Sequence, residues 1–205
     1  MLWNIGFARE IALLMLASVL IGAGMGIFFI RSSFGNRPRI IDRGSRLAEV
    51  IWALAVTVAL LWPLGVILLP SLFYNLPTIS GDSLGIMQFI GVLLWMIGGG
   101  TIIWSARELG KSFSPRIELG QGSRLITSGP YSIVRHPIYF GIIVAAAGQS
   151  IAFLSIPLFL LAMLIIILAR YRAAKEEALL SSPRAFGQEY SDYASRTGSL
   201  FPRMR

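Results

Sequence analysis

The sequence predicts an all-α integral membrane protein with five transmembrane helices, of which the last two form a helical hairpin. Of its 205 residues, 55% are hydrophobic and only 14% are charged, whereas about 25% of the residues in a soluble domain are charged. The mean hydropathy is +0.71. Long uncharged apolar stretches and a one-sided distribution of basic residues support the same prediction.

Three apolar stretches have about the length at which a helix crosses the hydrocarbon core of a bilayer. They are residues 11–30, 50–70 and 84–104. The first of them lacks a small-residue cleavage site. We therefore expect it to be a membrane anchor and not a cleaved signal peptide.

The fourth apolar region, residues 138–169, is too long for a single crossing. As one helix it would reach about 48 Å, against a hydrocarbon core of about 30 Å. Pro157 cannot continue a helix and favours a first-turn position, so a turn near Ser155 is the natural break. The region therefore predicts two helices, at residues 138–154 and 156–170, joined as a hairpin.

The basic residues gather in alternate connections between these spans. Residues 31–46 hold five of them, residues 107–135 another five and residues 170–205 seven, whereas residues 74–83 hold none. Cytoplasmic segments of membrane proteins carry the excess of lysine and arginine. The five-span arrangement with the N-terminus outside and the C-terminus cytoplasmic places every basic residue except Arg9 on the cytoplasmic side.

Composition also limits the chemistry that the protein can perform. The chain has no cysteine and a single histidine, so we expect neither disulfides nor a metal site. Its net charge of +8 fits membrane orientation and contact with anionic membrane lipids better than nucleic-acid binding. With no internal repeat, we interpret residues 1–205 as a single membrane domain.

Two groups of glycines lie within the predicted spans. Gly22 and Gly26 form a GxxxG pair, and Gly98, Gly99 and Gly100 are consecutive. Neither group follows a strand, so neither is a dinucleotide-binding fingerprint. We expect them to permit close helix packing. The glycines of the third span could alternatively clear room for a ligand.

The segment that leads into the fourth span concentrates polar, cationic and aromatic side chains. It contains Tyr131, Arg135, Tyr139 and His136, the only histidine of the chain, after a Ser-Gly-Pro turn that begins at Ser128. Such groups at the mouth of a membrane segment usually serve a ligand. The alternative is a connecting loop in which Tyr131 anchors at the interface and His136 bonds a loop carbonyl.

A second polar group follows the fifth span. Arg172 and Glu176 are four residues apart and share a helix face. Glu176 and Glu177 are adjacent carboxylates, which repel each other unless a cation lies nearby. A weak ion pair on a helix surface is the alternative interpretation for Arg172.

The C-terminal segment carries aromatic residues at helical spacing. Phe186, Tyr190 and Tyr193 would lie on one face of a short helix. We expect that face to lie on the membrane or over a pocket that it shields from water, with ordinary packing as the alternative.

Together, these motifs resemble the isoprenylcysteine carboxyl methyltransferase family, integral membrane enzymes that use S-adenosylmethionine. The resemblance covers the chain from Leu109 onward and lies in the order and rough spacing of the motifs. Residues 181–183 lengthen the connection after the carboxylate pair relative to the family pattern. The matching motifs are the turn with Gly129 and Tyr131, the Arg-His-Pro-Ile-Tyr run 135–139, the Lys-Glu-Glu run 175–177 and the Phe-Gly-Gln-Glu-Tyr run 186–190.

The resemblance implies a methyl transfer from S-adenosylmethionine to a lipophilic acceptor that enters from the bilayer, such as the carboxylate of an isoprenylcysteine. Arg172 would orient that carboxylate. Residues 105–137 and 170–205 would form the cytoplasmic cofactor-binding face. The cofactor-binding residues predicted on this basis are Leu125, Ile126, Tyr131, His136, Pro137, Ile138, Tyr139, Glu176 and Glu177.

Three other functions stay open at the level of sequence. Membrane sterol reductases, which use NADPH, carry a similar motif, but they have asparagine where this chain has Ile138. An N-methyltransferase acting on phospholipids or other lipid amines would need a base, for which His136, Tyr139 and Glu177 are candidates. A five-helix scaffold or transporter component would bind no cofactor.

Overall fold

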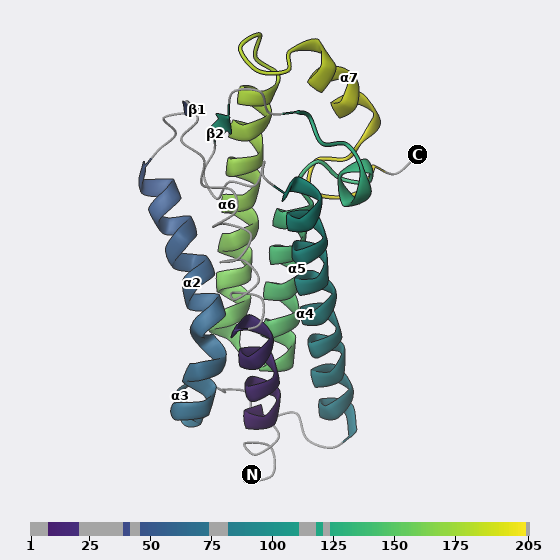
Figure 1. The fold of residues 1–205 in the computed structure, drawn as a ribbon. Coiled ribbons are helices and arrows are strands. Elements are labelled where there is room, and N and C mark those ends of the chain that lie inside the picture. Colours follow the sequence, from purple (N-terminus) through teal and green to yellow (C-terminus); the bar gives the residue numbers. More distant parts are fainter. Residues whose placement is uncertain are drawn as a thin grey trace.

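The computed structural model describes residues 8–20, 39–41, 46–73, 82–110, 118–120 and 124–203, and the chain forms a bundle of long helices with a polar cap at one end (Figure 1). Residues 8–20 are helical. The further elements are β1 (Arg39–Ile41), α2 (Arg46–Leu68), α3 (Pro70–Phe73), α4 (Asp82–Leu109), β2 (Glu118–Gly120), the 3₁₀ helix η2 (Gly129–Ser132), α5 (Pro137–Ala152), α6 (Ile156–Leu180) and α7 (Gln188–Arg196).

Three of the described helices are long and apolar enough to cross a membrane. They are Leu47–Leu68, Leu84–Leu109 and Ile156–Leu180, and α5 is a shorter apolar helix. The predicted second, third and fifth spans are confirmed as such helices. The predicted first span, residues 11–30, is helical up to residue 20, and its remainder lies outside the described residues. The count of five spans therefore stays a prediction.

The predicted hairpin between α5 and α6 is confirmed. Ser155 is the N-cap of α6, and its side chain accepts a hydrogen bond from the backbone N–H of Leu158. Pro157 lies in the first turn of α6, where its missing N–H costs no hydrogen bond. Phe153, in the turn, is fully buried. The hairpin places the start of α5 beside the far end of α6.

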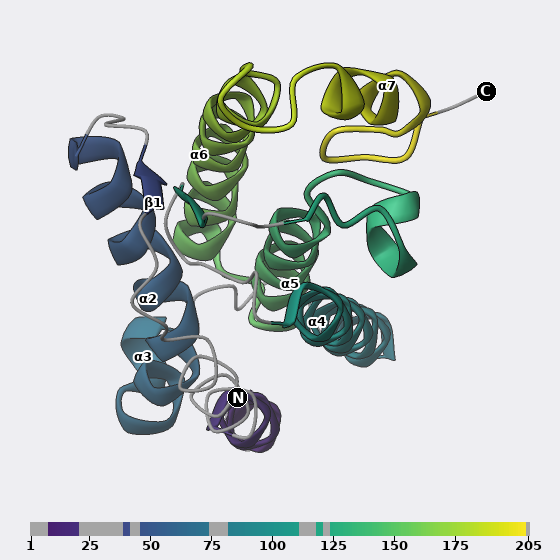
Figure 2. The same ribbon diagram turned by 45° about the horizontal axis from the view of Figure 1, so that its top comes forward.

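Helices α4 and α5 pack at very short range because glycines face each other (Figure 2). A Cβ added to Gly98 would lie 2.5 Å from the carbonyl oxygen of Gly141, and one added to Gly91 would lie 2.6 Å from that of Gly148. Close packing is thus confirmed for Gly98. An added Cβ at Gly99 or Gly100 meets no atom within 4 Å, and Gly22 and Gly26 lie outside the described residues.

A hydrophobic core joins α2, α5 and α6. Ala55 of α2, Ile143 of α5 and the α6 residues Ile165 and Ala169 are buried together in it. Many large apolar side chains on α2, α4 and α6 point outward instead, as expected for helices that face lipid. The core fixes α2 against the half of α6 that leads to the polar cap.

The polar cap gathers segments that are far apart in the sequence. Strand β1 pairs antiparallel with β2, Arg39 opposite Gly120, and both strands lie at the same end of the bundle as η2 and α7 (Figure 1). The all-α prediction missed this small sheet, because strands of three residues are too short to show an alternating pattern. The predicted one-sided placement of the basic residues stays a prediction, because many of them lie outside the described residues.

Candidate active site

The C-terminal segment holds the histidine-bearing connection in place through its backbone. Val134 and Gly198 form an isolated parallel bridge. The backbone N–H of Arg135 donates to the carbonyl of Gly198 at 2.8 Å, and that of His136 donates to the carbonyl of Ser199 at 3.2 Å. Helix α5 then begins at Pro137. The position of His136 is therefore set by residues more than sixty positions away.

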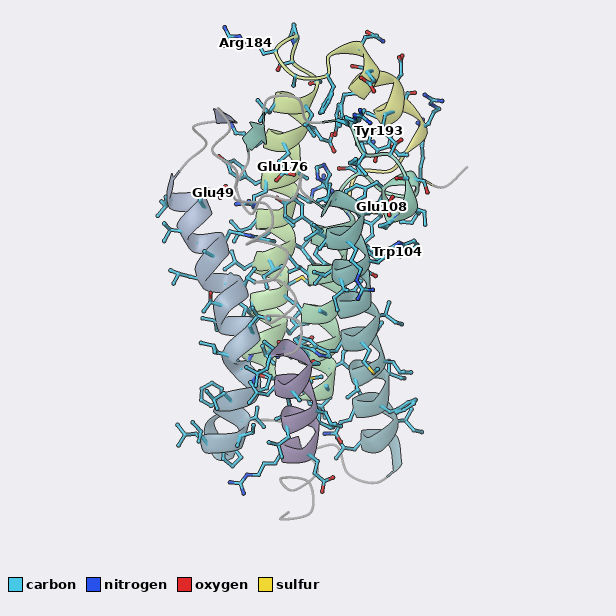
Figure 3. The ribbon with its side chains drawn as sticks, viewed as in Figure 1. Glu49, Trp104, Glu108, Glu176, Arg184 and Tyr193 are labelled. Carbon is cyan, nitrogen blue, oxygen red and sulfur yellow. The ribbon has the colours of Figure 1, made fainter. Side chains whose placement is uncertain are left out.

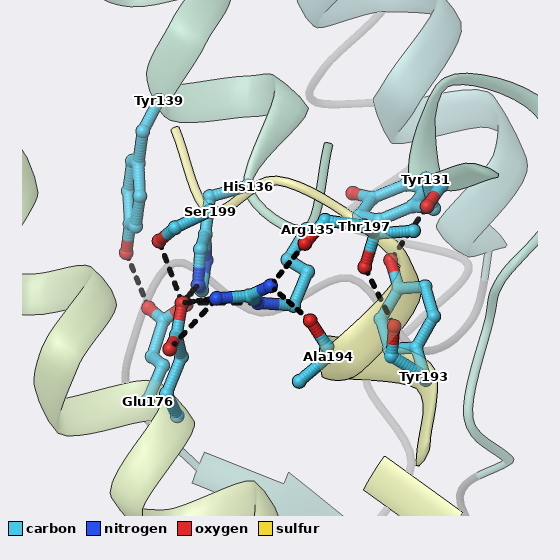
Figure 4. Close-up of polar contacts among 10 residues, drawn as sticks. Tyr131, Arg135, His136, Tyr139, Glu176, Tyr193, Ala194, Thr197 and Ser199 are labelled. Carbon is cyan, nitrogen blue, oxygen red and sulfur yellow. Dashed lines mark hydrogen bonds and ion pairs between the residues drawn. The ribbon is translucent and has the colours of Figure 1, made fainter. Parts of the chain in front are cut away.

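His136 lies between the two carboxylates at the end of α6 (Figure 4). Its Nδ1 is 3.3 Å from Oε2 of Glu176, and its Nε2 is 3.1 Å from Oε1 of Glu177. Burial opposes a charge on the ring, but the hydrogen bonds to Glu176 and Glu177 outweigh it, so the pKa of His136 is raised. Both ring nitrogens face carboxylate oxygens, an arrangement that favours the doubly protonated ring. The imidazolium is one cation that relieves the repulsion between the carboxylates.

Arg135 supplies a second cation and ties the C-terminal segment to α6. Its Nε and Nη2 donate to the two carboxylate oxygens of Glu177, both at 3.2 Å. Its Nη1 donates to the carbonyl oxygens of Ala194, at 2.9 Å, and Thr197. Ser199 also donates to Glu177, at 2.6 Å. Glu177 thus joins the connection before α5, the end of α6 and the C-terminal segment. We call Arg135, His136, Glu176, Glu177 and Ser199 the charged cluster.

Tyr139 connects this cluster to Arg172. Its hydroxyl donates a hydrogen bond to Glu176 and accepts one from Nε of Arg172 at 3.1 Å. Its ring stacks on that of His136, with centroids 5.7 Å apart. Arg172 is buried. The guanidinium of Arg172 and the carboxylate of Glu176 are one helical turn apart on α6, and they lie on either side of the Tyr139 hydroxyl.

Helix α2 completes the surroundings of Arg172. Glu49 pairs with Nη1 of the guanidinium, and the ring centroid of Trp52 lies 5.4 Å from its central carbon. Trp52 also meets Tyr139 edge to face, with centroids 5.4 Å apart. Figure 3 shows Glu49 on α2 and Glu176 on α6 near the same end of the bundle.

The turn before η2 is fixed against α4 and α7. Ser128 donates to Glu108 of α4, and Gly129 adopts a φ of +57° that favours glycine. The hydroxyl of Tyr193 donates to the carbonyl of Tyr131 at 2.6 Å (Figure 4). Burial raises the pKa of Tyr131 and raises that of Tyr193 to about 12. Both phenols therefore stay neutral at physiological pH.

The aromatic face of the C-terminal helix α7 packs inward. Tyr190 and Tyr193 are buried, and their rings meet edge to face with centroids 5.9 Å apart. The hydroxyl of Tyr190 is buried without a hydrogen-bond partner among the described residues. Burial raises the pKa of this phenol, and the nearby charge of Glu177 adds to the effect. Tyr190 and Tyr193 thus lie on the inward face of α7, next to the charged cluster, whereas Phe186 precedes the helix and is half-buried.

The structure brings most of the predicted site residues together. His136, Tyr139, Glu176, Glu177 and Arg172 form one contact network. Pro137 and Ile138 open α5 beside it, and Tyr131 joins through Tyr193. Leu125 and Ile126 are half-buried in the irregular chain before η2 and are not part of the contacts described above.

Sequence reasoning missed three members of the network. Arg135 was noticed only as part of a motif, and Ser199 and Glu49 were not predicted at all. For Glu49 a signal exists, because it is an acidic residue at the edge of an apolar span, a place where charged residues are rare and often functional. For Ser199 no local pattern distinguishes it from other loop serines.

A bundle of apolar helices with a partly buried charged cluster at one end is the arrangement of an integral membrane protein, and ionisable groups in such a place are candidates for a functional site. Residues 91–182, which hold most of that cluster, match the family model described as the isoprenylcysteine carboxyl methyltransferase (ICMT) family. This part of the chain is similar to that family.

Three individual relatives align with part of the chain, and two of them are named as methyltransferases. The chain is 29% identical over 120 residues to a probable protein-S-isoprenylcysteine O-methyltransferase from Oryza sativa subsp. indica, an alignment that covers 57% of this chain and 61% of the rice protein. The subsp. japonica protein aligns equally well. The nickel-cobalt-cadmium resistance protein NccN of Alcaligenes xylosoxydans xylosoxydans is 38% identical over 85 residues, which are 41% of this chain and 38% of NccN.

A solved structure shares the fold. The eukaryotic intramembrane Ras methyltransferase ICMT superposes with a TM-score of 0.56 at 21% sequence identity. The match covers 80% of this chain and 54% of that one. This chain therefore spans little more than half the length of the solved enzyme.

Proposed function

We propose that the protein is a membrane-embedded methyltransferase that moves a methyl group from S-adenosylmethionine to the carboxylate of a lipophilic acceptor such as an isoprenylcysteine. The observation that carries the proposal is the placement of Arg172 and Glu176 on either side of the Tyr139 hydroxyl. The Arg172 side suits an anionic acceptor, and the Glu176 side suits a cationic methyl donor. The names of the rice relatives support the same reaction.

The residues around His136 fit S-adenosylmethionine. The carboxylates of Glu176 and Glu177 suit its positive charges. The hydroxyl of Tyr190, which has no hydrogen-bond partner among the described residues, offers a hydrogen bond. When bound, S-adenosylmethionine supplies a methyl group on a positively charged sulfur. The proposed contacts are those expected from the resemblance: Leu125, Ile126, Tyr131, His136, Pro137, Ile138, Tyr139, Glu176 and Glu177.

Arg172 suits an acceptor carboxylate. A guanidinium donates paired hydrogen bonds in the geometry of a carboxylate, and burial strengthens the interaction because the local dielectric is low. A carboxylate is already a nucleophile, so no general base is needed. The task of the protein is to hold the carboxylate in line and to exclude water.

We place the site on the cytoplasmic side of a five-span protein, in a single domain of residues 1–205. The support is the concentration of basic residues in the sequence segments 31–46, 107–135 and 170–205. A soluble cofactor is available on that side, and the lipophilic acceptor enters from the bilayer. Contact with anionic lipids at the cap follows from the same charge.

Calorimetry on the detergent-solubilised protein tests the choice of cofactor. We expect saturable binding of S-adenosylmethionine and S-adenosylhomocysteine and none of NADPH. Binding of NADPH alone would favour a sterol-type reductase and overturn the proposal. If a labelled methyl group instead reaches phosphatidylethanolamine and no carboxylate, the enzyme is a lipid amine methyltransferase.

A further inference from the structure

Arg172, the residue assigned to the acceptor carboxylate, already binds a carboxylate of this chain. Glu49 of α2 pairs with its Nη1. The two residues lie 123 positions apart, and Glu49 falls outside the segment that matches the family model. The role of Glu49 therefore has to be argued from its contacts and its exposure.

The two partners of this ion pair differ in how far they are exposed at the surface of the protein. The side chain of Arg172 is 3% exposed, whereas that of Glu49 is 35% exposed. A buried arginine without a counter-charge is strongly destabilising, so Arg172 needs an anion at all times. Glu49 lies in the first turn of α2 and can rotate outward more easily than Arg172, because a third of its side chain is already exposed. Another anion can thus replace Glu49, whereas Arg172 stays in place.

The neighbours of Arg172 would keep the guanidinium in place during such an exchange. Its Nε donates to the hydroxyl of Tyr139 at 3.1 Å, and the rings of Trp52 and Tyr139 lie 5.4 Å and 5.8 Å from its central carbon. These contacts do not involve Glu49. They hold the plane of the guanidinium and leave the anion at Nη1 free to change.

We infer that Glu49 is an internal carboxylate that occupies the acceptor position on Arg172, and that an acceptor carboxylate binds by displacing it. This inference rests on the proposed function. It makes Glu49 a specificity-determining residue, because a neutral lipid cannot replace the carboxylate of Glu49 at Nη1 of Arg172. Methylation converts the acceptor carboxylate into a neutral ester, so Glu49 returns to Arg172 and favours release of the product.

The test compares wild type with Glu49→Gln, which keeps the size of the side chain and removes its charge. Binding of N-acetyl-S-farnesylcysteine and of its methyl ester is measured by calorimetry, and kcat and KM are measured with the acid as acceptor. We expect the acid to bind about tenfold more tightly to the variant, with a matching fall in KM. The ester should bind both proteins equally.

Two further variants make the result specific. Glu189→Gln removes the same charge from an exposed position on α7 and should leave the affinities for acid and ester unchanged. Glu49→Asp shortens the reach of the carboxylate and should tighten binding of the acid to an intermediate degree. It provides the measurement if Glu49→Gln does not fold.

The inference is overturned if the acid binds Glu49→Gln, or a folded Glu49→Asp, no more tightly than it binds wild type. Weaker binding would mean that Glu49 only orients Arg172. Equal tightening of acid and ester would mean a general rearrangement of the site. A wild-type protein that methylates no lipophilic carboxylate refutes the proposed function itself, whereas an active wild type with an unchanged Glu49→Gln refutes only the role of Glu49.

Discussion

The α4–α5 interface and the charged cluster at the cap are both tightly packed, but they are held together by different forces. In the interface, backbone meets backbone through Gly98 and Gly141, and van der Waals contact supplies the attraction. In the cluster, His136, Arg135 and Glu177 pair opposite charges. The first arrangement tolerates no added volume and performs no chemistry. The second can exchange partners, which a binding site requires.

The largest effect should come from Arg172→Ala at the charged end. Loss of the guanidinium removes the group that holds the acceptor carboxylate, so we expect kcat to fall by about 10²-fold to 10³-fold. Affinity for S-adenosylhomocysteine should change by less than about threefold, since Glu176 and His136 remain. Arg170→Ala, at an exposed position two residues away, is the control. Unchanged methylation kinetics in Arg172→Ala would remove this residue from the mechanism.

A glycine substitution tests the apolar side of the comparison. Gly98→Leu should destabilise the protein by about 3 kcal/mol, because the side chain has no space against the backbone of α5. Gly99→Leu is the matched control and should cost little, since an added Cβ there meets nothing within 4 Å. Thermal unfolding in detergent measures both. Equal stability of the two variants would contradict the close approach of α4 and α5.

A smaller effect should come from loosening the contact between the charged cluster and the C-terminal segment. Arg135→Gln loses the ion pair with Glu177 and the hydrogen bonds to Ala194 and Thr197. We expect about 2 kcal/mol of local destabilisation. Limited trypsin digestion should then cleave at Arg196 several-fold faster than in wild type. A cleavage rate equal to that of wild type would mean that α7 is held mainly by Tyr190 and Tyr193.

The smallest effect is a dependence of stability on pH. The pKa of His136 is raised by Glu176 and Glu177 despite burial, so the folded state binds its proton more tightly than the unfolded chain does. This stabilisation is fully present below about pH 6.5 and is lost as the pH rises through the higher folded pKa. Unfolding midpoints between about pH 6 and pH 9 should fall for wild type.

His136→Gln is the control for this pH dependence. The amide does not titrate, so the variant should lose the part of the slope that His136 contributes, although it is less stable overall. If its midpoint falls with pH as steeply as that of wild type, other groups cause the slope and His136 is not the titrating residue.

The apolar side of the molecule was largely predictable from sequence. Span length and the position of Pro157 predicted the hairpin, and the glycines of α4 indicated close packing, because both depend on neighbours in the chain. The packing partners Gly141 and Gly148 were not predicted. Their choice depends on the rotation of α5 against α4, which no local pattern records.

The charged cluster was predictable in part. The motif around His136 and the pair of carboxylates at Glu176 were expected to hold one cofactor between them, and the structure places them in direct contact. The anchoring of His136 by Ser199 and the pairing of Arg172 with Glu49 were not foreseen. Both are single contacts between distant segments, so neither leaves a periodic signal in the sequence.

One measurement tests the central claim most directly. Purified protein is incubated with isotope-labelled S-adenosylmethionine and N-acetyl-S-farnesylcysteine, and the product is analysed by mass spectrometry. We predict one labelled methyl group on the carboxylate oxygen, formed by wild type and lost in Arg172→Ala. No labelled ester from a protein that binds S-adenosylmethionine, or equal amounts from both proteins, would contradict the assignment of this site.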